Sequence, residues 1–356
     1  MRVLILGGTG AIGSFLVEYF TDTDNEVYVT SRKDRKDYKN IHYLKGNAHD
    51  QAFISPILEK KWDAIVDFMV YDSEEFAKAL PALCEATNQY VFLSSARVFA
   101  DSAIIDEKSP KLIDVIDDRD YLSSNDYAIR KCREERIIVD SGYNNCTIIR
   151  PYITFSEKRL QLGILEKEKW LYRALDRRAI VIYGDFLDRM TTLTFGKDVA
   201  FCIGKLIGNR LAIGEDYNIM NPEPITWREI LSVYLDAIEA KFGYRPNVVQ
   251  QDITRSGKGY YGWRYDRNYN RVFDINKLRN TIGQYDFVDA KSALRNSIDS
   301  FLDNPSFLAI NYADEAEFDR ITGESTPLSR IIGIRNKAKY LLCRYFLMRR
   351  IINLFR

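Results

Sequence analysis

Tyr127 and Lys131 are the residues whose chemistry and spacing first indicate catalysis. They lie four positions apart, so a helix would place the phenol and the ammonium on one face. At about 4 Å and an effective dielectric of about 20, an ammonium favours a phenolate by about 4 kcal/mol. That attraction can bring the pKa of the phenol from about 10 toward neutrality, where it can exchange a proton with a hydroxyl or carbonyl group. Because the same spacing is common in helices without catalytic roles, the pair needs support from the rest of the sequence.

A glycine-rich turn at the start of the chain gives that support. The apolar run 2–6 has strand character, and residues 14–20 have the pattern of an amphipathic helix. The glycines between them permit a tight turn and let backbone N–H groups approach a pyrophosphate at the helix N-terminus. This strand–turn–helix context predicts a dinucleotide-binding turn. Its residues are Gly7, Thr9, Gly10, Ala11, Ile12 and Gly13.

A pair of serines follows another predicted strand. The apolar run 90–93 ends in Ser94 and Ser95. Side chains at the carboxyl ends of parallel strands face the ligand crevice of an open sheet, so these hydroxyls are candidates for substrate contact. Ordinary turn chemistry is the alternative explanation for two serines at a strand end.

The ordered set of glycine turn, Ser-Ser, Tyr-x-x-x-Lys and Arg150-Pro151 resembles the extended short-chain dehydrogenase/reductase family, in its branch of nucleotide-sugar epimerases, dehydratases and reductases. The segments 217–219 and 226–229 add to the likeness. The resemblance implies that Tyr127 acts as the acid/base. It also implies that Lys131 binds the nicotinamide ribose and lowers the pKa of the phenol.

The resemblance further implies that Ser95 holds the substrate oxygen, because Ser95 directly precedes an Ala-x-Val-aromatic stretch. Two departures from the family pattern follow it. The usual Val-Tyr-Gly is Val98-Phe99-Ala100 here, so the substrate loop is altered. The dehydratase branch has an Asp-Glu pair where this chain has Ala96 and Arg97, which argues against elimination of water.

Alternating strand and helix patterns predict the fold class. We expect an α/β protein with a Rossmann-type doubly wound parallel sheet, a smaller C-terminal α/β substrate lobe and a basic C-terminal helix. The expected domains are 1–156, to which segments of 178–222 return, a substrate lobe at 157–329 and a tail at 330–356. The predicted strands are 2–6, 26–31, 41–45, 63–68, 89–94 and 146–150, and the predicted helices are 11–21, 50–60, 73–87 and 125–140.

Cofactor choice depends on the end of the second predicted strand. An acidic residue there would bond a ribose 2′-hydroxyl, whereas a cation would accommodate a 2′-phosphate. Ser31 occupies the acidic position and Arg32 follows it, which favours NADP over NAD. The alternative is that Arg32 lies in a solvated turn and that Asp34 or Asp37 serves the ribose. Asn47 stands where the family usually has an Asp beside the adenine, and its amide can still bond the base.

Arginines supply the candidate contacts to substrate. The stretch 257–271 mixes cations with aromatic residues, which suits a diphosphate and a stacked base, and a Tyr-rich surface loop is the alternative. The net charge of +1 gives no overall basic surface, so we do not expect nucleic acid as a partner. The candidate substrate-binding residues are Arg97, Arg264, Arg267 and Arg271.

The C-terminal segment departs from the family pattern. Residues 330–356 hold eight Lys or Arg and no acid, which leaves −7 for the rest of the chain. A basic segment with a broad apolar face predicts contact with an anionic membrane surface. The alternative is a tail that packs on its own domain or on a second subunit, as in a homodimer.

The amino-acid composition limits the size of the core, the cellular location and the kinds of site that we expect. With 46% apolar residues, the 356-residue chain can bury a sizeable core. Five scattered cysteines suit a reducing cytosol, so we expect a cytoplasmic protein, with the inner face of the cell membrane as an alternative location. His42 and His49 are the two histidines, and neither has a Cys or His neighbour, so we expect no metal site.

These features predict an NAD(P)-dependent enzyme that transfers hydride at a secondary alcohol or ketone of a nucleotide-linked or lipid-linked sugar. We expect a role in surface polysaccharide synthesis, with reductase slightly favoured over epimerase. The alternative is a non-catalytic dinucleotide-binding protein that serves as a redox sensor or binds RNA. Retention of Ser95, Tyr127 and Lys131 favours the enzyme, because a pure binder has no need of all three.

Overall fold

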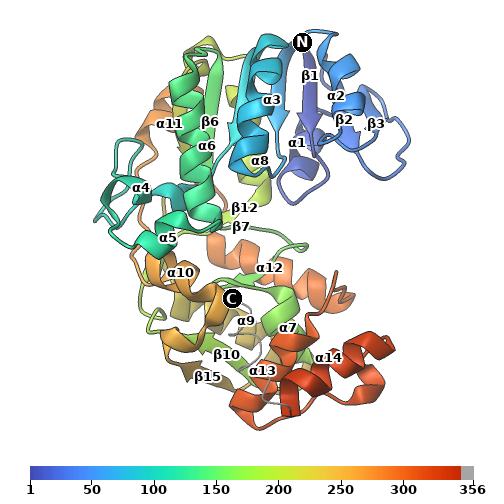
Figure 1. Ribbon diagram of the computed structural model, residues 1–356, viewed down its shortest axis with the longest axis vertical. Coiled ribbons are helices and arrows are strands. Elements are labelled where there is room, and N and C mark those ends of the chain that lie inside the picture. Colours follow the sequence, from blue (N-terminus) through green and yellow to red (C-terminus); the bar gives the residue numbers. More distant parts are fainter. Residues whose placement is uncertain (346–356) are drawn as a thin grey trace. The chain divides into compact units, whose positions relative to one another are not determined.

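The computed structural model describes residues 1–345, and its main feature is a seven-stranded parallel sheet (Figure 1). The strand order is β13-β6-β5-β4-β1-β2-β3. The chain therefore winds outward from β1 to β3, returns to β4 beside β1, and winds the other way. The strands are β1 (Arg2–Leu6), β2 (Glu26–Ser31), β3 (Ile41–Lys45), β4 (Trp62–Asp67), β5 (Thr87–Leu93), β6 (Cys146–Pro151) and β13 (Asp216–Ile219). This topology confirms the predicted doubly wound fold, in which ligands generally bind at the carboxyl edge, where the winding reverses.

Helices cover both faces of the sheet. On one face lie α2 (Gln51–Leu58), α3 (Ser73–Glu85) and α6 (Tyr127–Ser141). On the other, α8 (Gly196–Leu206) is tied to β5 by the Gln89 amide, which donates to the Leu206 carbonyl at 3.0 Å. Helix α1 (Gly13–Phe20) packs along α8, and Lys197 and Glu18 form an ion pair between them at 3.0 Å. The predicted helices and strands match these elements to within two residues at each end.

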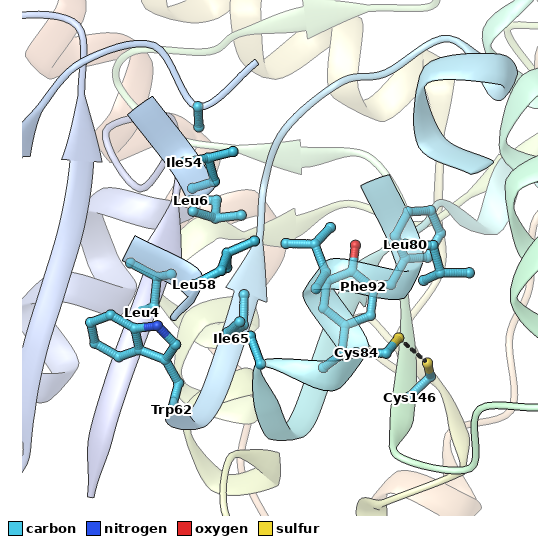
Figure 2. Packing of buried hydrophobic residues seen from close by; sticks show 14 of the residues in the cluster. Leu4, Leu6, Ile54, Leu58, Trp62, Ile65, Leu80, Cys84, Phe92 and Cys146 are labelled. Atoms are coloured by element: carbon cyan, nitrogen blue, oxygen red, sulfur yellow. Dashed lines mark hydrogen bonds between the residues drawn. The ribbon is translucent and has the colours of Figure 1, made fainter. Parts of the chain in front are cut away.

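The core under α2 and α3 follows from the alternation of side chains along the strands (Figure 2). Leu4 and Leu6 of β1 and Ile65 of β4 are fully buried on this face. At the β5–β6 end of the same cluster, the Cys84 and Cys146 sulfurs are 3.4 Å apart, and both are free thiols. The five cysteines are scattered in the sequence, but the fold brings these two together.

A network of buried charges fixes α6 to the sheet. The Glu135 carboxylate accepts from Arg150 Nε at 2.7 Å and Nη2 at 2.9 Å, and from Lys111 Nζ at 2.6 Å. Arg150 Nη1 also donates to Asp216 at 2.7 Å. Burial disfavours the charged form of Glu135, but the charges and hydrogen bonds of Arg150 and Lys111 outweigh it and hold its pKa below the ordinary value.

The described chain forms two compact units. The first contains residues 1–158, 190–225 and 269–294, and the second contains 159–189, 226–268 and the residues from 295 onward. Residues 269–294 lie within the predicted substrate lobe at 157–329, but they belong to the unit of the large sheet. Shorter elements of the first unit are η1 (Ala96–Val98), α4 (Leu112–Val115), α5 (Arg119–Ser123), α11 (Asn276–Ile282), and the paired β7 (Thr154–Phe155) and β12 (Thr194–Phe195).

The second unit is built from helices around a small parallel pair of strands. Helix α9 begins with a capping box between Thr226 and Glu229, and it ends at Gly243 in the left-handed conformation. The elements are α7 (Lys167–Leu175), α9 (Trp227–Phe242), α10 (Tyr260–Gly262), α13 (Tyr312–Thr322), α14 (Ile334–Tyr345), the parallel pair β10 (Ile180–Tyr183) and β15 (Val248–Gln251), and the antiparallel pair β8 (Gln161–Leu162) and β9 (Leu165–Glu166).

The described part of the basic tail packs within this second unit. Tyr340 of α14 is buried, and its hydroxyl donates to Asp319 of α13 at 2.8 Å. Asp319 also binds Arg173 of α7 at 2.9 Å, so α14 joins a buried charge network. This arrangement favours the packing alternative for residues 330–345, while positions 346–356 of the predicted membrane-contacting segment lie outside the described residues. Among helices of residues 1–345, none is both long enough and apolar enough to cross a membrane.

Glu135→Gln should lower the free energy of unfolding by about 3–5 kcal/mol, because it leaves the buried Arg150 charge without its main partner. Urea denaturation followed by circular dichroism would measure the change. Asp114→Asn is the matched control, since its ion pair with Arg136 at 2.6 Å is exposed and should contribute less than about 1 kcal/mol.

The pH dependence gives a second measurement of the same prediction. A carboxyl with a lowered folded-state pKa stabilises the protein above its unfolded pKa of about 4.3, and this contribution is lost as the pH falls through the folded value. The wild type should therefore lose more stability than Glu135→Gln on acidification below about pH 4. Equal losses in the two proteins, or equal effects of the two substitutions at neutral pH, would contradict the assigned role of Glu135.

Candidate active site

The glycine turn after β1 has the geometry that a pyrophosphate-binding turn requires. Gly7 has φ +69°, and the N–H of Thr9 donates back to its carbonyl at 2.8 Å. A Cβ on Gly13 would lie 2.7 Å from the backbone of Gly8, so α1 starts in direct contact with the turn. At Gly10, by contrast, a Cβ would meet no atom within 4 Å.

The start of α1 is also free of side-chain caps among the described residues. Ile12 at the N-cap makes no side-chain bond to the helix, and the first turn has no acidic residue. Backbone N–H groups at an uncapped N-terminus are suitable donors for an anion. The open space at Gly10 and this uncapped terminus together fit a dinucleotide pyrophosphate.

The residues predicted to select the cofactor lie at the same edge of the sheet. The Ser31 hydroxyl at the end of β2 donates to the Lys33 carbonyl at 2.8 Å, so it belongs to a local turn. Arg32 follows it and is exposed to solvent. Asn47, after β3, is exposed, and its side-chain oxygen accepts from the His49 N–H at 3.3 Å. Arg32 is therefore available to a ligand, and its part in cofactor choice stays a prediction.

The two serines after β5 have different environments. Ser94 is buried, and its hydroxyl donates to the Glu135 carboxylate. The Ser95 oxygen caps the short helix η1 and accepts from the Arg97 N–H at 3.3 Å. Because Ser94 is used within the buried network, the geometry is compatible with the choice of Ser95 as the substrate-contacting hydroxyl.

Tyr127 is the first residue of α6 and is half-buried. Asp126 caps the helix by accepting from the Ala128 N–H at 2.9 Å, which fixes the backbone at the tyrosine. The guanidinium carbons of Arg97 and Arg130 lie 5.6 Å and 5.7 Å from the centroid of the Tyr127 ring. Sequence reasoning singled out Arg97 but missed Arg130, although its position three residues after Tyr127 on the helix could have indicated the contact.

Lys131 is almost completely buried, with 2% of its side chain exposed. Its ammonium lies 2.8 Å from an oxygen of the buried Glu134 and 4.5 Å from the centroid of the Phe92 ring. Burial raises the pKa of the Glu134 carboxyl, and the attraction of Lys131 only partly opposes this. The predicted partners of the ammonium are Tyr127 and the ribose, and the structure adds the Glu134 carboxylate.

A second carboxyl, Asp67 at the end of β4, lies in the same buried region. It accepts from the Tyr71 hydroxyl at 3.0 Å and the Tyr90 hydroxyl at 2.8 Å. Burial raises its pKa, and the charge of Lys131 acts in the opposite direction. Glu134 could have been found from its helical spacing to Lys131, but no sequence signal connected Asp67 with the site.

Two of the other predicted substrate-binding arginines, Arg267 and Arg271, are buried. Arg267 is buried in the second unit, where its Nε donates to the Gly163 carbonyl at 2.9 Å. Arg271 is buried in the first unit, and its Nη1 donates to the Phe99 and Ala100 carbonyls at 3.0 Å and 3.1 Å. Both guanidiniums bond the protein's own backbone, which argues against the predicted diphosphate clamp.

Arg264 differs from these two because it is exposed and hydrogen-bonds the Tyr260 hydroxyl. It lies in the second unit with Arg267, whereas Arg271 belongs to the first. Within residues 1–345, no group of three or more His, Cys, Asp or Glu side chains has an arrangement that could hold a metal ion.

Comparison with known proteins gives a family match over most of the chain. The model of the NAD dependent epimerase/dehydratase family matches residues 3–219. Among curated proteins, the chloroplast stem-loop binding protein of 41 kDa b from Arabidopsis thaliana is 25% identical over 242 residues, which cover 64% of this chain and 60% of the relative. The chain thus spans about 60% of the length of this relative.

Solved structures share the fold at low sequence identity. The epimerase Mth375 from Methanothermobacter thermautotrophicus has a TM-score of 0.66 and 16% identity, with 85% of this chain and 92% of that chain covered. The Bordetella bronchiseptica enzyme WbmH, solved with NAD⁺, has a TM-score of 0.65 and 15% identity, with coverages of 86% and 99%. The UDP-glucuronic acid 4-epimerase from Bacillus cereus, solved with UDP-glucuronic acid and NAD, has a TM-score of 0.64 and 14% identity, with coverages of 85% and 99%.

Gly10→Ala should affect dinucleotide binding, whereas Gly13→Ala should affect stability. Gly10→Ala should keep the melting temperature, because its methyl group enters open space, but it should weaken dinucleotide binding at least about tenfold if the pyrophosphate occupies that space. Gly13→Ala should lower the melting temperature, because its methyl group would collide with the Gly8 backbone. Calorimetric titration and thermal melting would measure both. Unchanged dinucleotide affinity in Gly10→Ala would place the pyrophosphate elsewhere.

Proposed function

Since the chain belongs to the NAD dependent epimerase/dehydratase family, we propose that it is an NAD(P)-dependent oxidoreductase or epimerase acting on a nucleotide-linked sugar. This family lies within the extended short-chain dehydrogenases/reductases. The observation that carries the proposal is the presence of Ser95 just after β5 and of Tyr127 and Lys131 on α6, together with a glycine turn after β1 that fits a dinucleotide. The solved relatives that contain NAD or a nucleotide sugar agree with this substrate class.

Each candidate residue would have a separate role in the reaction. A dinucleotide held by residues 7–13 and Lys131 would supply the chemistry of hydride transfer. The Tyr127 hydroxyl exchanges the accompanying proton with the alcohol or ketone oxygen, and the Ser95 hydroxyl holds that oxygen by a hydrogen bond. Lys131 would bind the ribose hydroxyls of the nicotinamide, while Glu134 holds its ammonium at 2.8 Å. The backbone of 7–13 would bind the pyrophosphate.

Reduction is slightly favoured over epimerisation. Ala96 and Arg97 stand where elimination of water would need a pair of carboxyls, so dehydration is disfavoured. An epimerase oxidises and then reduces one centre, which favours retained NAD, whereas a reductase exchanges its cofactor, more often NADP. The exposed Arg32 after Ser31 supports NADP, and with it a reductase. The same proposal includes a lipid-linked sugar as an alternative substrate. It also includes a role of the enzyme in surface polysaccharide synthesis.

A non-catalytic function is the second candidate, and one comparison favours it. The curated relative from Arabidopsis thaliana is named a stem-loop binding protein, which agrees with the RNA-binding alternative on the same fold. The net charge of +1 and the retained catalytic set weigh against it. A cytoplasmic location, a homodimer and contact of residues 330–356 with an anionic membrane surface also remain proposals.

Tyr127→Phe should lower kcat by about a hundredfold or more, because only the proton-transferring hydroxyl is lost. Its dinucleotide affinity should stay within about twofold of wild type. Steady-state kinetics on nucleotide sugars and a dinucleotide titration would test both expectations. Tyr143→Phe is the matched control, since that hydroxyl bonds the exposed Glu85 at 3.0 Å, just beyond the far end of α6. Turnover of Tyr127→Phe at the wild-type rate would refute the assignment.

Arg32→Ala should weaken NADPH binding at least about tenfold and leave NADH binding within about twofold. The reason is that the guanidinium would contact the 2′-phosphate, which NADPH carries and NADH lacks. Fluorescence titration with both reduced cofactors measures the two affinities. Arg35→Ala serves as the control, because Arg35 lies in the same exposed segment with its guanidinium carbon 5.7 Å from the Tyr43 ring centroid. An equal loss for both cofactors, or binding of NADH alone by the wild type, would contradict a preference for NADP.

A further inference from the structure

Two cysteines that lie far apart in the sequence meet inside the first unit. Cys84 is in the last turn of α3, and Cys146 is the first residue of β6. Their sulfur atoms are 3.4 Å apart, and both groups are free thiols (Figure 2). The sulfurs of a disulfide are about 2.05 Å apart, so closing this bond requires an approach of only about 1.4 Å.

Contacts of the backbone hold the two cysteines next to each other. The side-chain amide of Asn145, the residue before Cys146, donates to the Cys84 carbonyl at 2.9 Å and to the Thr87 carbonyl at 3.0 Å. On its other side, β6 pairs with β5 in a register that sets Cys146 beside Tyr90. The end of α3 and the start of β6 are therefore joined close to the two sulfurs, so the thiols stay within reach of each other.

The hydrogen bond between the thiols also favours ionisation of one of them. With Cys84 as the donor, this bond lowers the pKa of the Cys146 thiol below its ordinary value and raises the pKa of Cys84. At Cys132, by contrast, burial raises the pKa of the thiol to about 12. Because the thiolate is the form of cysteine that attacks an oxidant, Cys146 is the residue of the pair that we expect to react first.

The pair is buried but lies close to exposed parts of the chain. Cys84 and Cys146 have 2% and 4% of their surface exposed. The next residue after Cys84, Glu85, is exposed, and the exposed Asn144 lies two residues before Cys146. A local opening of the turn 142–145 is therefore enough to let a small oxidant reach the sulfurs.

We propose that Cys84 and Cys146 form a reversible disulfide when the protein meets hydrogen peroxide, and that the bond stabilises the segment that carries the candidate site. The Cys146 thiolate attacks one peroxide oxygen, which gives a sulfenic acid and releases hydroxide that becomes water. The Cys84 sulfur then attacks the Cys146 sulfur, and the second oxygen leaves as water with the Cys84 proton. Two thiols and one peroxide thus give one disulfide and two waters, and two electrons pass from sulfur to oxygen.

The disulfide would close a long loop around the candidate site. Cys84 and Cys146 are 62 positions apart, and the chain between them contains Ser95, Tyr127 and Lys131. A bond across such a loop stabilises the protein mainly by restricting the unfolded chain. The cysteines meet at the amino end of β6, whereas Ser95 follows the carboxyl end of the parallel strand β5. Dinucleotide binding should therefore be the same in the reduced and oxidised proteins.

Treatment of the full-length protein with hydrogen peroxide tests the disulfide directly. After catalase removes the peroxide and the remaining thiols are alkylated under denaturing conditions, peptide mass spectrometry should find Cys84 linked to Cys146. The melting temperature of the oxidised protein should be at least about 3 °C higher than that of the reduced protein. A dithiol reductant should restore both thiols and reverse this rise. Dinucleotide affinity should stay within about twofold throughout.

Substitutions assign the rise in melting temperature to this pair. Cys84→Ala and Cys146→Ala should each abolish both the linked peptide and the rise. Cys202→Ala is the matched control, since Cys202 is also buried, in α8, and its substitution should leave both in place. Loss of a buried sulfur can itself lower the melting temperature, so each variant is compared with itself before and after peroxide.

Three results would overturn the proposal. The first is wild-type protein in which Cys84 and Cys146 stay unlinked after peroxide, or in which Cys146 ends as a sulfinic or sulfonic acid. The second is a linked protein that melts within about 1 °C of the reduced one, because the bond would then stabilise nothing. The third is an unchanged rise in Cys84→Ala or Cys146→Ala. None of these results bears on the proposed function, because the two thiols have no part in the proposed reaction.

Discussion

The candidate active site depends on the buried contact between Glu135 and Arg150. It joins α6, which carries Tyr127 and Lys131, to β6, the second strand from one edge of the sheet. The same carboxylate accepts from Ser94, which comes directly before Ser95 at the end of β5. One ionised group thus fixes both the helix with the candidate acid/base and the strand end with the candidate hydroxyl. Such a charge is tolerated in the interior only because every oxygen is matched by a donor.

Two neighbouring glutamates on α6 have carboxyl pKa values that are shifted in opposite directions by their surroundings. Glu135 is surrounded by donors, and they hold its pKa below the ordinary value despite complete burial. Glu134, one residue earlier, meets Lys131 but fewer donors, so desolvation dominates and raises its pKa. Side chains one position apart on a helix point in different directions, here toward two separate clusters. One glutamate therefore anchors the helix, and the other shares the lysine of the candidate site.

The sheet and its turn could be predicted from sequence because their signals are local. Strand runs, the glycine spacing and the serines after β5 all lie within short segments, and the structure places them as expected along one parallel sheet. The contacts of Lys131 with Glu134 and of Arg130 with the Tyr127 ring follow from helical spacing and could have been found in the same way.

The contacts that could not be predicted are buried ones between segments that lie far apart in the sequence. Arg267 and Arg271 look like surface cations in an aromatic stretch, yet backbone carbonyls far away in the chain take up their donors. Asp67 and Tyr90 meet only because β4 and β5 pair side by side. The cationic composition of the tail indicated a surface role, whereas the position of Tyr340 against Asp319 is a property of the folded second unit.

The hydrogen bond of the Tyr340 hydroxyl gives the end of the described chain a structural role in addition to its positive charge. Asp319 accepts from this hydroxyl and from the Thr326 N–H while it pairs with Arg173. A chain cut before α14 would leave this carboxylate with one donor fewer in a region that excludes water. Helix α14 is consequently an integral part of the second unit, because its removal alters the electrostatic balance inside that unit, so the effects of removing it would include a loss of folding as well as a loss of surface contacts.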